Sequence, residues 1–422
     1  MNTIQTRTRL ILSLIAAAGL SIASGCASRG YTKEASNAAQ QRAIQFRGGV
    51  QLSMAQQQFL AGDLDKALKT VDGVIAANPQ VAAAHVLRGR VLSERGALEE
   101  SRRSFLTAES LDPANVEAQY YLGIVYERFS QPDEAMNRYK RAMDLDRANP
   151  QYVVAAAEML VAQNKLEEAD ALLVERRSDF EANAGIRQLQ GQIALLRSDP
   201  AAAARALREA SMLAPDDHNI REDLARAQLV AQQHSDALIT LDRLLGVEAN
   251  RQRRDLRSMR AQALIGLDRL GDARTELVNL TSDEAGTRDA AAWFELGKLC
   301  ARMNDLDRLR FAAGRVVSLW PNRYEGFMLR GMHASLSGDT KAAIQHLDRA
   351  ISLTSTDARP LILKAVLLEE TGRTHEAVEV LSRAIERDGG RDPRLMEYLA
   401  ALQLREGTAA MQADPNAANI NP

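Results

Sequence analysis

The side chains best suited to metal binding or nucleophilic catalysis are few in this chain of 422 residues. It has two cysteines, Cys26 and Cys300, and six histidines. The histidines share no ligand or acid–base spacing and are His85, His218, His234, His333, His346 and His375. The chain has no phosphate-binding glycine loop, nucleophile elbow, His-Glu-x-x-His sequence or Cys-x-x-Cys sequence. We therefore expect no catalytic residue, no metal site and no cofactor.

Cys26 is the residue whose neighbours predict chemistry. Arg7 and Arg9 precede a mostly apolar stretch, residues 10–22, which is shorter than the roughly 20 residues of a membrane-spanning helix. The small residues Ala-Ser-Gly then lead directly into Cys26. This order predicts a secretory signal. Because Cys300 lies instead within a helical pattern, we expect no disulfide between the two cysteines.

The segment before Cys26 resembles the lipobox of bacterial lipoproteins, with Ala23 at a position where that family prefers leucine. The resemblance implies a signal peptide at 1–25, an acylated thiol on Cys26 and a tether to the fold at 26–33. Two or three acyl chains would anchor the protein stably in a membrane. Ala27, in place of aspartate, implies sorting to the periplasmic face of the outer membrane of a bacterial cell envelope. An ordinary signal peptide with a cysteine nearby remains the alternative.

Composition favours a helical protein without a nucleic-acid partner. Apolar residues make up 46% of the sequence and charged residues 26%, but aromatic residues only 4%. Alanine is abundant, which favours helices packed through small side chains. The formal net charge is −2, and loss of Arg7 and Arg9 would leave 51 of the 53 basic residues against 55 acidic ones, near −4. Such a protein has no basic surface for nucleic acid.

Small residues recur with a period of thirty-four. One series is Ala67, Ser101, Ala135, Ala169, Ala203 and Ala237, and a second lies twelve residues upstream at Ala55, Gly89, Gly123, Ala157, Gly191 and Ala225. In both series the spacing is then two residues longer at two successive steps, after which the period of thirty-four returns. The first series continues with Ala273, Leu309, Ala343 and Ala377, and the second with Ala261, Gly297, Gly331 and Ala365. Apolar or aromatic residues follow the first series by four, among them Val71, Phe105, Tyr139, Leu207 and Leu347. This period predicts stacked helix pairs, each too small to bury its own apolar face.

The repeat resembles the tetratricopeptide repeat (TPR) family, most clearly in Tyr121-Leu122-Gly123 with Ala135 and in Trp293 with Leu296-Gly297. The resemblance implies an all-α fold, a right-handed α-solenoid of about ten helix-turn-helix units over residues 34–406. The units start near 48, 82, 116, 150, 184, 218, 254, 290, 324 and 358, with capping helices at 34–47 and 393–406. The units at 150 and 254 depart from the pattern, because Arg176 and Leu280 replace a small residue. The tail, 407–422, is predicted to be disordered.

Several single residues fit this helical repeat. Four glycines fall where the two helices of a unit meet and are expected to adopt a left-handed cap: Gly62, Gly96, Gly338 and Gly372. Trp293 and Trp320 fit core or near-core positions. Cys300 occupies a core position and is expected to be a buried, inert thiol.

In TPR proteins the first helices of successive units line a concave groove, which the residue after the small position usually faces. The resemblance assigns this position to Gln56, Arg90, Ile124, Glu158, Gln192, Arg226, Gln262, Lys298, Met332 and Val366. Tyr120 and Phe294 lie on the same helices and would either stack on a ligand or pack in the core. The series has no asparagine, so the Asn–Lys carboxylate clamp of chaperone-binding members is not expected.

The sequence therefore predicts a non-catalytic scaffold, because repeats and caps fill nearly all of residues 34–406. We expect it to bind a protein partner through the groove and a membrane through its lipid. It would assist the assembly of a secretion, pilus or polysaccharide-export machine. The alternative is a groove that binds polysaccharide or another glycan directly, through stacking aromatic rings.

Overall fold

The computed structural model describes the backbone of residues 29–413, without the side chains of 29–36, 39, 41, 43–45 and 407–413. This part of the protein is all-α, with 22 α-helices, two short 3-10 helices and no strand. It divides into two compact bodies, an N-terminal body ending at residue 159 and a C-terminal body beginning at residue 160. The predicted signal peptide and Cys26 lie outside the described residues.

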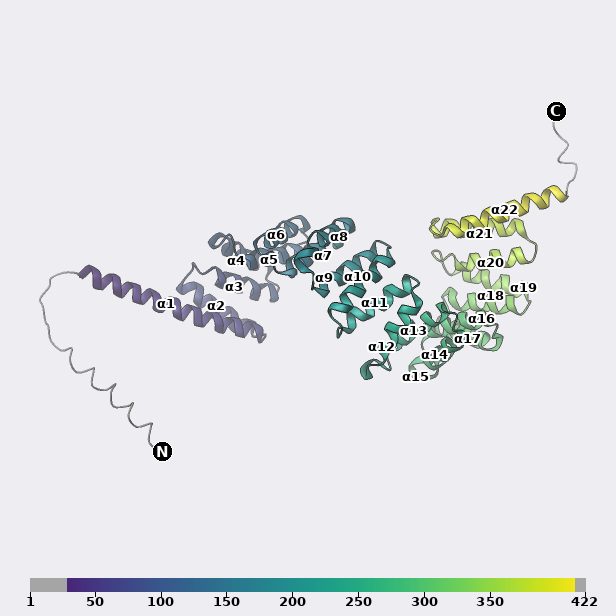
Figure 1. The fold of residues 1–422 in the computed structure, drawn as a ribbon, viewed down its shortest axis with the longest axis horizontal. Helices are drawn as coiled ribbons and strands as arrows, with labels where there is room; N and C mark the ends of the chain where they lie inside the picture. The colour runs from purple at the N-terminus through teal and green to yellow at the C-terminus, as the bar shows by residue number, and fades with distance from the viewer. Residues whose placement is uncertain (1–28, 414–422) are drawn as a thin grey trace, which may run out of the picture. The chain divides into compact units, whose positions relative to one another are not determined.

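The N-terminal body is a stack of antiparallel helices in sequence order (Figure 1). Its helices are α1 (Arg29–Leu60), α2 (Leu64–Ala77), α3 (Ala82–Glu94), α4 (Leu98–Leu111), α5 (Val116–Arg128), α6 (Pro132–Leu145) and the greater part of α7 (Pro150–Ala162). Within it, α1 packs on α2, α3 on α4 and α5 on α6. Each helix pair therefore corresponds to one predicted repeat unit.

The C-terminal body continues the same pattern. Its helices are α8 (Leu166–Glu175), α9 (Ala184–Leu196), α10 (Pro200–Leu213), α11 (His218–Val230), α12 (His234–Leu245), α13 (Arg254–Gly266), α14 (Leu270–Ser282), α15 (Glu284–Thr287), α16 (Ala290–Arg302), α17 (Leu306–Leu319), α18 (Tyr324–Leu336), α19 (Thr340–Ser352), α20 (Arg359–Glu370), α21 (Thr374–Asp388) and α22 (Pro393–Ala413). Two 3-10 helices, η1 (Arg177–Phe180) and η2 (Glu248–Asn250), interrupt it. The protein is thus an α-solenoid in each body, as predicted.

Nine predicted unit starts coincide with helix starts to within one residue, from Ala82 of α3 to Arg359 of α20. The ends of the solenoid differ from the prediction. Helix α1 runs through residue 48 without a break and begins at Arg29, inside the predicted tether. Helix α22 extends to Ala413, so residues 407–413, predicted as disordered tail, are helical. Extending a helix by one residue costs far less than starting one, which explains why both terminal helices exceed the predicted caps.

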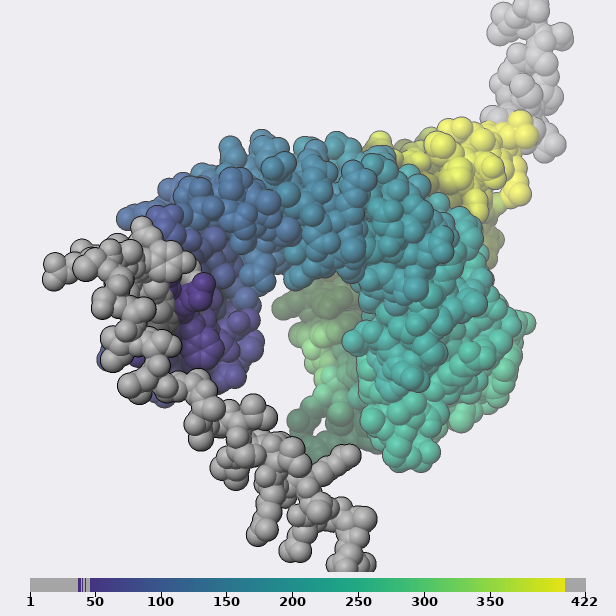
Figure 2. Space-filling view, turned by 60° about the vertical axis from the view of Figure 1, so that its left-hand side comes forward, coloured from purple at the N-terminus to yellow at the C-terminus, as the bar shows by residue number. Residues whose placement is uncertain are grey.

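The small residues do hold the paired helices together. The ten positions of the first series, from Ala67 to Ala377, are completely buried. Four of the five glycines of the second series leave room for a large side chain of the paired helix: a Cβ atom on Gly89 would lie 2.6 Å from the Phe105 ring, and one on Gly191 2.5 Å from Leu207. Ser101 Oγ also donates a hydrogen bond to the Gly89 carbonyl at 2.7 Å. Side chains thereby fill the space between neighbouring helices in each body (Figure 2).

The turns between paired helices confirm the predicted left-handed caps. Gly62, Gly96, Gly338 and Gly372 have φ angles between 75° and 81°. The corresponding residues of the other six units are not glycine but adopt the same conformation, with φ between 55° and 60°: Ser130, Asn164, Ser198, Gln232, Asp268 and Asn304. The turn geometry is therefore fixed by the fold, and glycine only makes it easier to adopt.

Irregular segments explain the two register slips and the unit at 150. The repeat unit that contains η2, before α13, is two residues longer than the period, and so is the unit that contains α15, before α16. In the unit at 150, α8 has 10 residues where α4, α6 and α10 have 14 each. Arg176 stands where three other units bury Ala108, Ala142 and Ala210, and helix α8 ends just before it, at Glu175.

Several predicted core positions are confirmed. Trp293 is buried in the core of the C-terminal body, and Trp320 packs partly buried against it. Cys300 is a fully buried free thiol, and burial raises its pKa to about 11.

No helix among the described residues is both long enough and apolar enough to cross a bilayer.

Candidate functional site

A pocket of about 280 Å³ opens between the first helices α16, α18 and α20 of the C-terminal body. Lys298, Met332 and Val366, the last three groove positions predicted from the sequence, all line it. The structure therefore brings these three residues, each thirty-four apart in the sequence, into one apolar site.

The floor of this pocket depends on a missing side chain. Gly331 has no Cβ, and one added there would lie 2.8 Å from Leu347 Cγ. Leu347 of α19 therefore extends past Gly331 of α18 and lines the pocket. Leu336, Leu363 and Leu367 complete the apolar walls, and Leu336 remains 45% exposed.

Charged groups flank the apolar walls with opposite signs at the two ends. On α16, Lys298 lies 2.8 Å from Glu295 and Arg302 lies 2.8 Å from Asp268. On α20, an exposed glutamate, Glu370, lines the other end. The pocket can thus hold an aliphatic group of a bound segment. The charged groups at its rim favour one orientation of the charged residues that flank this group in the segment.

Three of the lining residues that the sequence interpretation missed follow a simple rule. Arg302, Leu336 and Glu370 each lie four residues after a predicted groove position and so occupy the next turn of the same helix face. Extending the predicted series by one helical turn would have found them. The gap at Gly331 that exposes Leu347 depends on the packing of two helices and has no such local signal.

Two predicted groove residues of the N-terminal body, Arg90 and Tyr120, belong to a second cluster, which is built from aromatic rings. Arg90 lies between two rings, 5.0 Å from the Phe59 centroid and 4.9 Å from that of Tyr121. Tyr120 contacts the rings of Tyr121 and Tyr152 at centroid distances of 5.3 and 5.2 Å. Most of the ring surface is therefore used within the protein, and Tyr152 is buried.

The remaining predicted positions do not join either cluster. Gln56, Glu158, Gln192, Arg226 and Gln262 are exposed, and Ile124 is half-buried. The neighbouring Gln192 and Arg226 both contact Asp223, at 3.2 and 3.0 Å.

Phe294 and Glu158, two of the predicted groove residues, differ in their burial. Phe294 is a core residue, 7% exposed, and its ring faces the Lys298 ammonium at 5.0 Å. Although the Glu158 side chain is exposed, partial desolvation of its carboxyl group and the charge of Glu127 raise its pKa. No group of three or more metal-ligating side chains occurs in the described part of the protein.

Comparison with protein families agrees with this architecture. A family model described as TPR repeat matches residues 89–128, and one described as tetratricopeptide repeat matches residues 335–402. The chain is a tetratricopeptide repeat protein. Repeats of this type indicate a scaffold for protein–protein interaction, with protein partners bound in a groove. No curated protein sequence matches it.

Solved structures with similar folds include yeast Tom70, at 15% identity and a TM-score of 0.45, over 86% of this chain and 89% of that one. PilW, a type IV pilus biogenesis factor, has 14% identity and a TM-score of 0.41, over 47% of this chain and 92% of its own. YrrB, a TPR protein with an unusual peptide-binding site, has 20% identity and a TM-score of 0.34, over 40% of this chain and 87% of its own.

Proposed function

We propose that this protein is a non-catalytic, lipid-anchored scaffold of the bacterial cell envelope that holds a partner protein in the pocket between α16, α18 and α20. The observation that carries the proposal is the pocket itself, because it combines apolar walls with a charged rim at the predicted groove positions. An aliphatic anchor buried in such a pocket contributes most of the affinity in many peptide complexes.

The charges of the rim define the partner segment further. Lys298 and Arg302 are paired with Glu295 and Asp268, whereas Glu370 has no ion pair among the described side chains and favours a basic residue on the α20 side of the anchor. A segment with an acidic residue on that side would place like charges together. The pocket thus selects both an aliphatic anchor and a direction for the bound segment.

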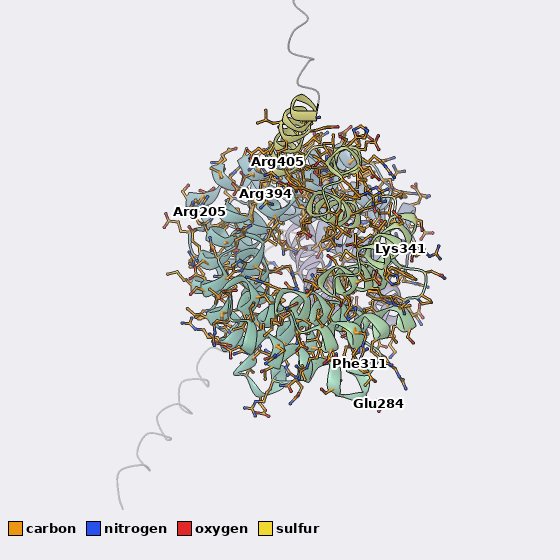
Figure 3. All side chains as sticks on the ribbon, turned by 90° about the vertical axis from the view of Figure 1, so that its right-hand side faces the viewer. Arg205, Glu284, Phe311, Lys341, Arg394 and Arg405 are labelled. Carbon is orange, nitrogen blue, oxygen red and sulfur yellow. The ribbon has the colours of Figure 1, made fainter. Side chains whose placement is uncertain are left out.

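Site-specific photocrosslinking in intact membranes tests this proposal. A photoreactive residue at Met332 should crosslink to a protein partner, whereas the same residue at Lys341, exposed on α19 and projecting outward (Figure 3), should not. Leu336→Glu should abolish the Met332 crosslink while leaving the helical circular dichroism unchanged, since Leu336 is already half-exposed. Equal crosslinking at Met332 and Lys341, or an undiminished crosslink in the Leu336→Glu variant, would contradict the proposal.

The anchor is proposed from the sequence before Cys26. Acylation of its thiol would place the solenoid at a membrane surface, most simply the periplasmic face of the outer membrane, where it would assist a secretion, pilus or polysaccharide-export machine. Metabolic labelling with a palmitate analogue should mark the wild-type protein but not Cys26→Ala, which should also leave the membrane fraction. Labelling of the Cys26→Ala variant would refute lipidation at this residue.

Direct glycan binding is the alternative function, and the aromatic cluster of the N-terminal body is the observation that bears on it. Sugar stacking needs free ring faces, but Tyr120 contacts three other tyrosine rings at 5.2 to 5.9 Å. Its hydroxyl also accepts a hydrogen bond from Gln151 Nε2 at 2.9 Å. Protein binding is therefore the better supported function. Glycan-array binding that is lost on Tyr120→Ala would reverse this preference.

A further inference from the structure

Helix α1 carries an exposed apolar side that does not pack against the N-terminal body. It has 32 residues and its partner α2 has 14, so α1 extends well beyond α2 (Figure 1). Phe46, Val50 and Met54 follow one another at intervals of four residues and therefore lie along one side of α1. They are 76%, 57% and 46% exposed. We call these three residues the α1 stripe.

The α1 stripe faces away from the core. The residues that this part of α1 contributes to the core are Leu52, Ala55 and Phe59, and Ala55 is completely buried. At about 3.6 residues per turn, these three lie on the side of the helix opposite Val50, the middle residue of the stripe. A surface helix normally has one apolar side and one polar side. Helix α1 is apolar on two opposite sides, and the fold covers only one of them.

The charge of α1 restricts what could cover the stripe. Between Glu34 and Asp63 the sequence has no acidic residue, whereas Arg42 and Arg47 lie in this span and are both exposed. Arg42 lies one helical turn before Phe46, and Arg47 follows Phe46 directly, so both arginines lie beside one end of the stripe. Neither forms an ion pair with a described side chain. The surface that covers the stripe should therefore be apolar and should carry negative charge.

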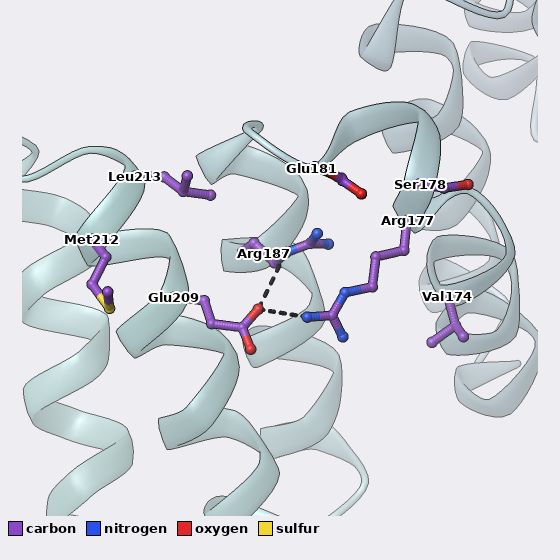
Figure 4. A pocket seen from close by; sticks show the side chains of 8 residues that line it. All are labelled: Val174, Arg177, Ser178, Glu181, Arg187, Glu209, Met212 and Leu213. Carbon is purple, nitrogen blue, oxygen red and sulfur yellow. Dashed lines mark hydrogen bonds and ion pairs between the residues drawn. The ribbon is translucent and has the colours of Figure 1, made fainter.

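The arginines of a pocket in the C-terminal body are, in contrast, already compensated. This pocket, of about 590 Å³, lies beside the early end of α8. Arg177 Nη2 and Arg187 Nε lie 2.9 and 3.3 Å from the same oxygen, Oε2 of Glu209 (Figure 4). The arginines beside the α1 stripe have no such carboxylate.

A phospholipid membrane fits the stripe better than a second copy of the chain. Two α1 helices packed through their stripes would bring their arginines together without a carboxylate between them. A membrane supplies acyl chains for the apolar side chains and anionic headgroups for the arginines. Helix α1 also begins at Arg29, close behind Cys26, the proposed site of acylation. The proposed lipid would therefore hold this helix next to the membrane surface.

We propose that the α1 stripe lies in the headgroup region of an anionic phospholipid membrane, with Arg42 and Arg47 at the lipid phosphates. The inference rests on the proposed lipid anchor and adds an orientation to it, because α1 then lies along the membrane surface. Three apolar side chains and two arginines give only weak, reversible binding, so the stripe does not replace the lipid. Loss of the lipid should therefore still release the protein from the membrane.

Fluorescence quenching by spin-labelled lipid tests this contact on the full-length protein, purified from membranes and reconstituted into vesicles of phosphatidylethanolamine and phosphatidylglycerol. A polarity-sensitive fluorophore is attached to Val50→Cys or, as the matched control, to Gln56→Cys. Gln56 is exposed on the same helix, about 120° around it from Val50. A nitroxide on the upper acyl chain should remove at least half of the fluorescence at Val50 and little of it at Gln56.

Two sets of variants separate the apolar and charged contributions to this contact. Phe46→Ser should reduce quenching of the Val50 probe on all vesicles. Arg42→Gln combined with Arg47→Gln should remove the difference in quenching between vesicles with and without phosphatidylglycerol. All three side chains are exposed, so the fold should persist.

The outcomes for the stripe and for the anchor can be told apart. Cys300 is buried, so fluorophore labelling of the protein without an introduced cysteine would show that Cys26 is not acylated and would contradict the anchor. If Cys26 is acylated but the Val50 probe is not quenched, the anchor stands and the stripe proposal fails. Equal quenching at Val50 and Gln56, or a disulfide between the Val50→Cys residues of two copies, would also overturn the stripe proposal.

Discussion

Replacing Gly89 by alanine tests how the paired helices are held together. The new Cβ would lie 2.6, 2.7 and 2.8 Å from three atoms of the Phe105 ring. Ordinary contacts between carbon atoms lie near 3.5–4.0 Å, so the ring must move by about 1 Å. Phe105 is completely buried and stacks on Tyr121 at 5.7 Å, which leaves it little room to move.

The expected cost follows from two opposing effects. Overpacking of a rigid core costs about 1–3 kcal/mol. Alanine in a helix interior is favoured over glycine by about 1 kcal/mol. Gly73→Ala measures the second effect alone, because nothing lies within 4 Å of a Cβ at this position of α2. The Gly89→Ala variant should therefore be less stable than the Gly73→Ala variant by about 1–3 kcal/mol.

Urea unfolding followed by circular dichroism measures both variants under the same conditions. We expect a lower midpoint for Gly89→Ala and a slightly higher one for Gly73→Ala than for the wild type. In a Phe105→Ala background, where the ring is removed, the cost of Gly89→Ala should shrink. If Gly89→Ala were as stable as Gly73→Ala, the close approach of ring and glycine would not hold the pair together and the reasoning would fail.

Three further predictions concern single residues. Gln232→Gly should raise stability by about 0.5–1 kcal/mol in thermal unfolding, because Gln232 has a φ of 58° that glycine adopts without strain; a loss of stability would contradict this. Burial alone would raise the pKa of Asp357, but hydrogen bonds from Arg359 and Tyr324 lower it to about 2. Since the folded pKa lies below the unfolded value of about 3.9, this contribution is present above pH 4 and is lost as pH falls toward 2; Asp357→Asn should weaken that acid dependence in unfolding titrations. Cys300, with a pKa of about 11, should resist alkylation by iodoacetamide at neutral pH until the protein is unfolded, and rapid labelling of the native protein would show that it is accessible.

The sequence alone determined the fold class and most of its register. The thirty-four-residue period of small residues predicted the helix starts from Ala82 onward, and all ten positions of the first series are buried. This was possible because a helix places residues on faces by local geometry, so the period reports which side of each helix is buried. The same rule placed Lys298, Met332 and Val366 on one face.

The terminal helices and the use of aromatic rings were less predictable. Residue 48 is a repeat boundary by period and is followed by a second glycine, yet α1 passes through Gly48 and Gly49, because a cost of about 1 kcal/mol for each glycine does not stop a helix that is already formed. Phe294 and Tyr120 occupy similar helical faces, but the first is a core residue and the second is half-exposed. Their exposure depends on which neighbouring side chains lie over them.

Only the tertiary structure decided where the pockets lie. Arg176 was recognisable in the sequence as a departure from a small residue, but the shortened α8 and the open space beside it arise from packing against neighbouring helices. Leu347 reaches the groove because Gly331, on another helix, leaves a gap. A repeat period specifies which face each residue occupies. Whether the space between faces is filled depends on the shapes of side chains that meet only after folding.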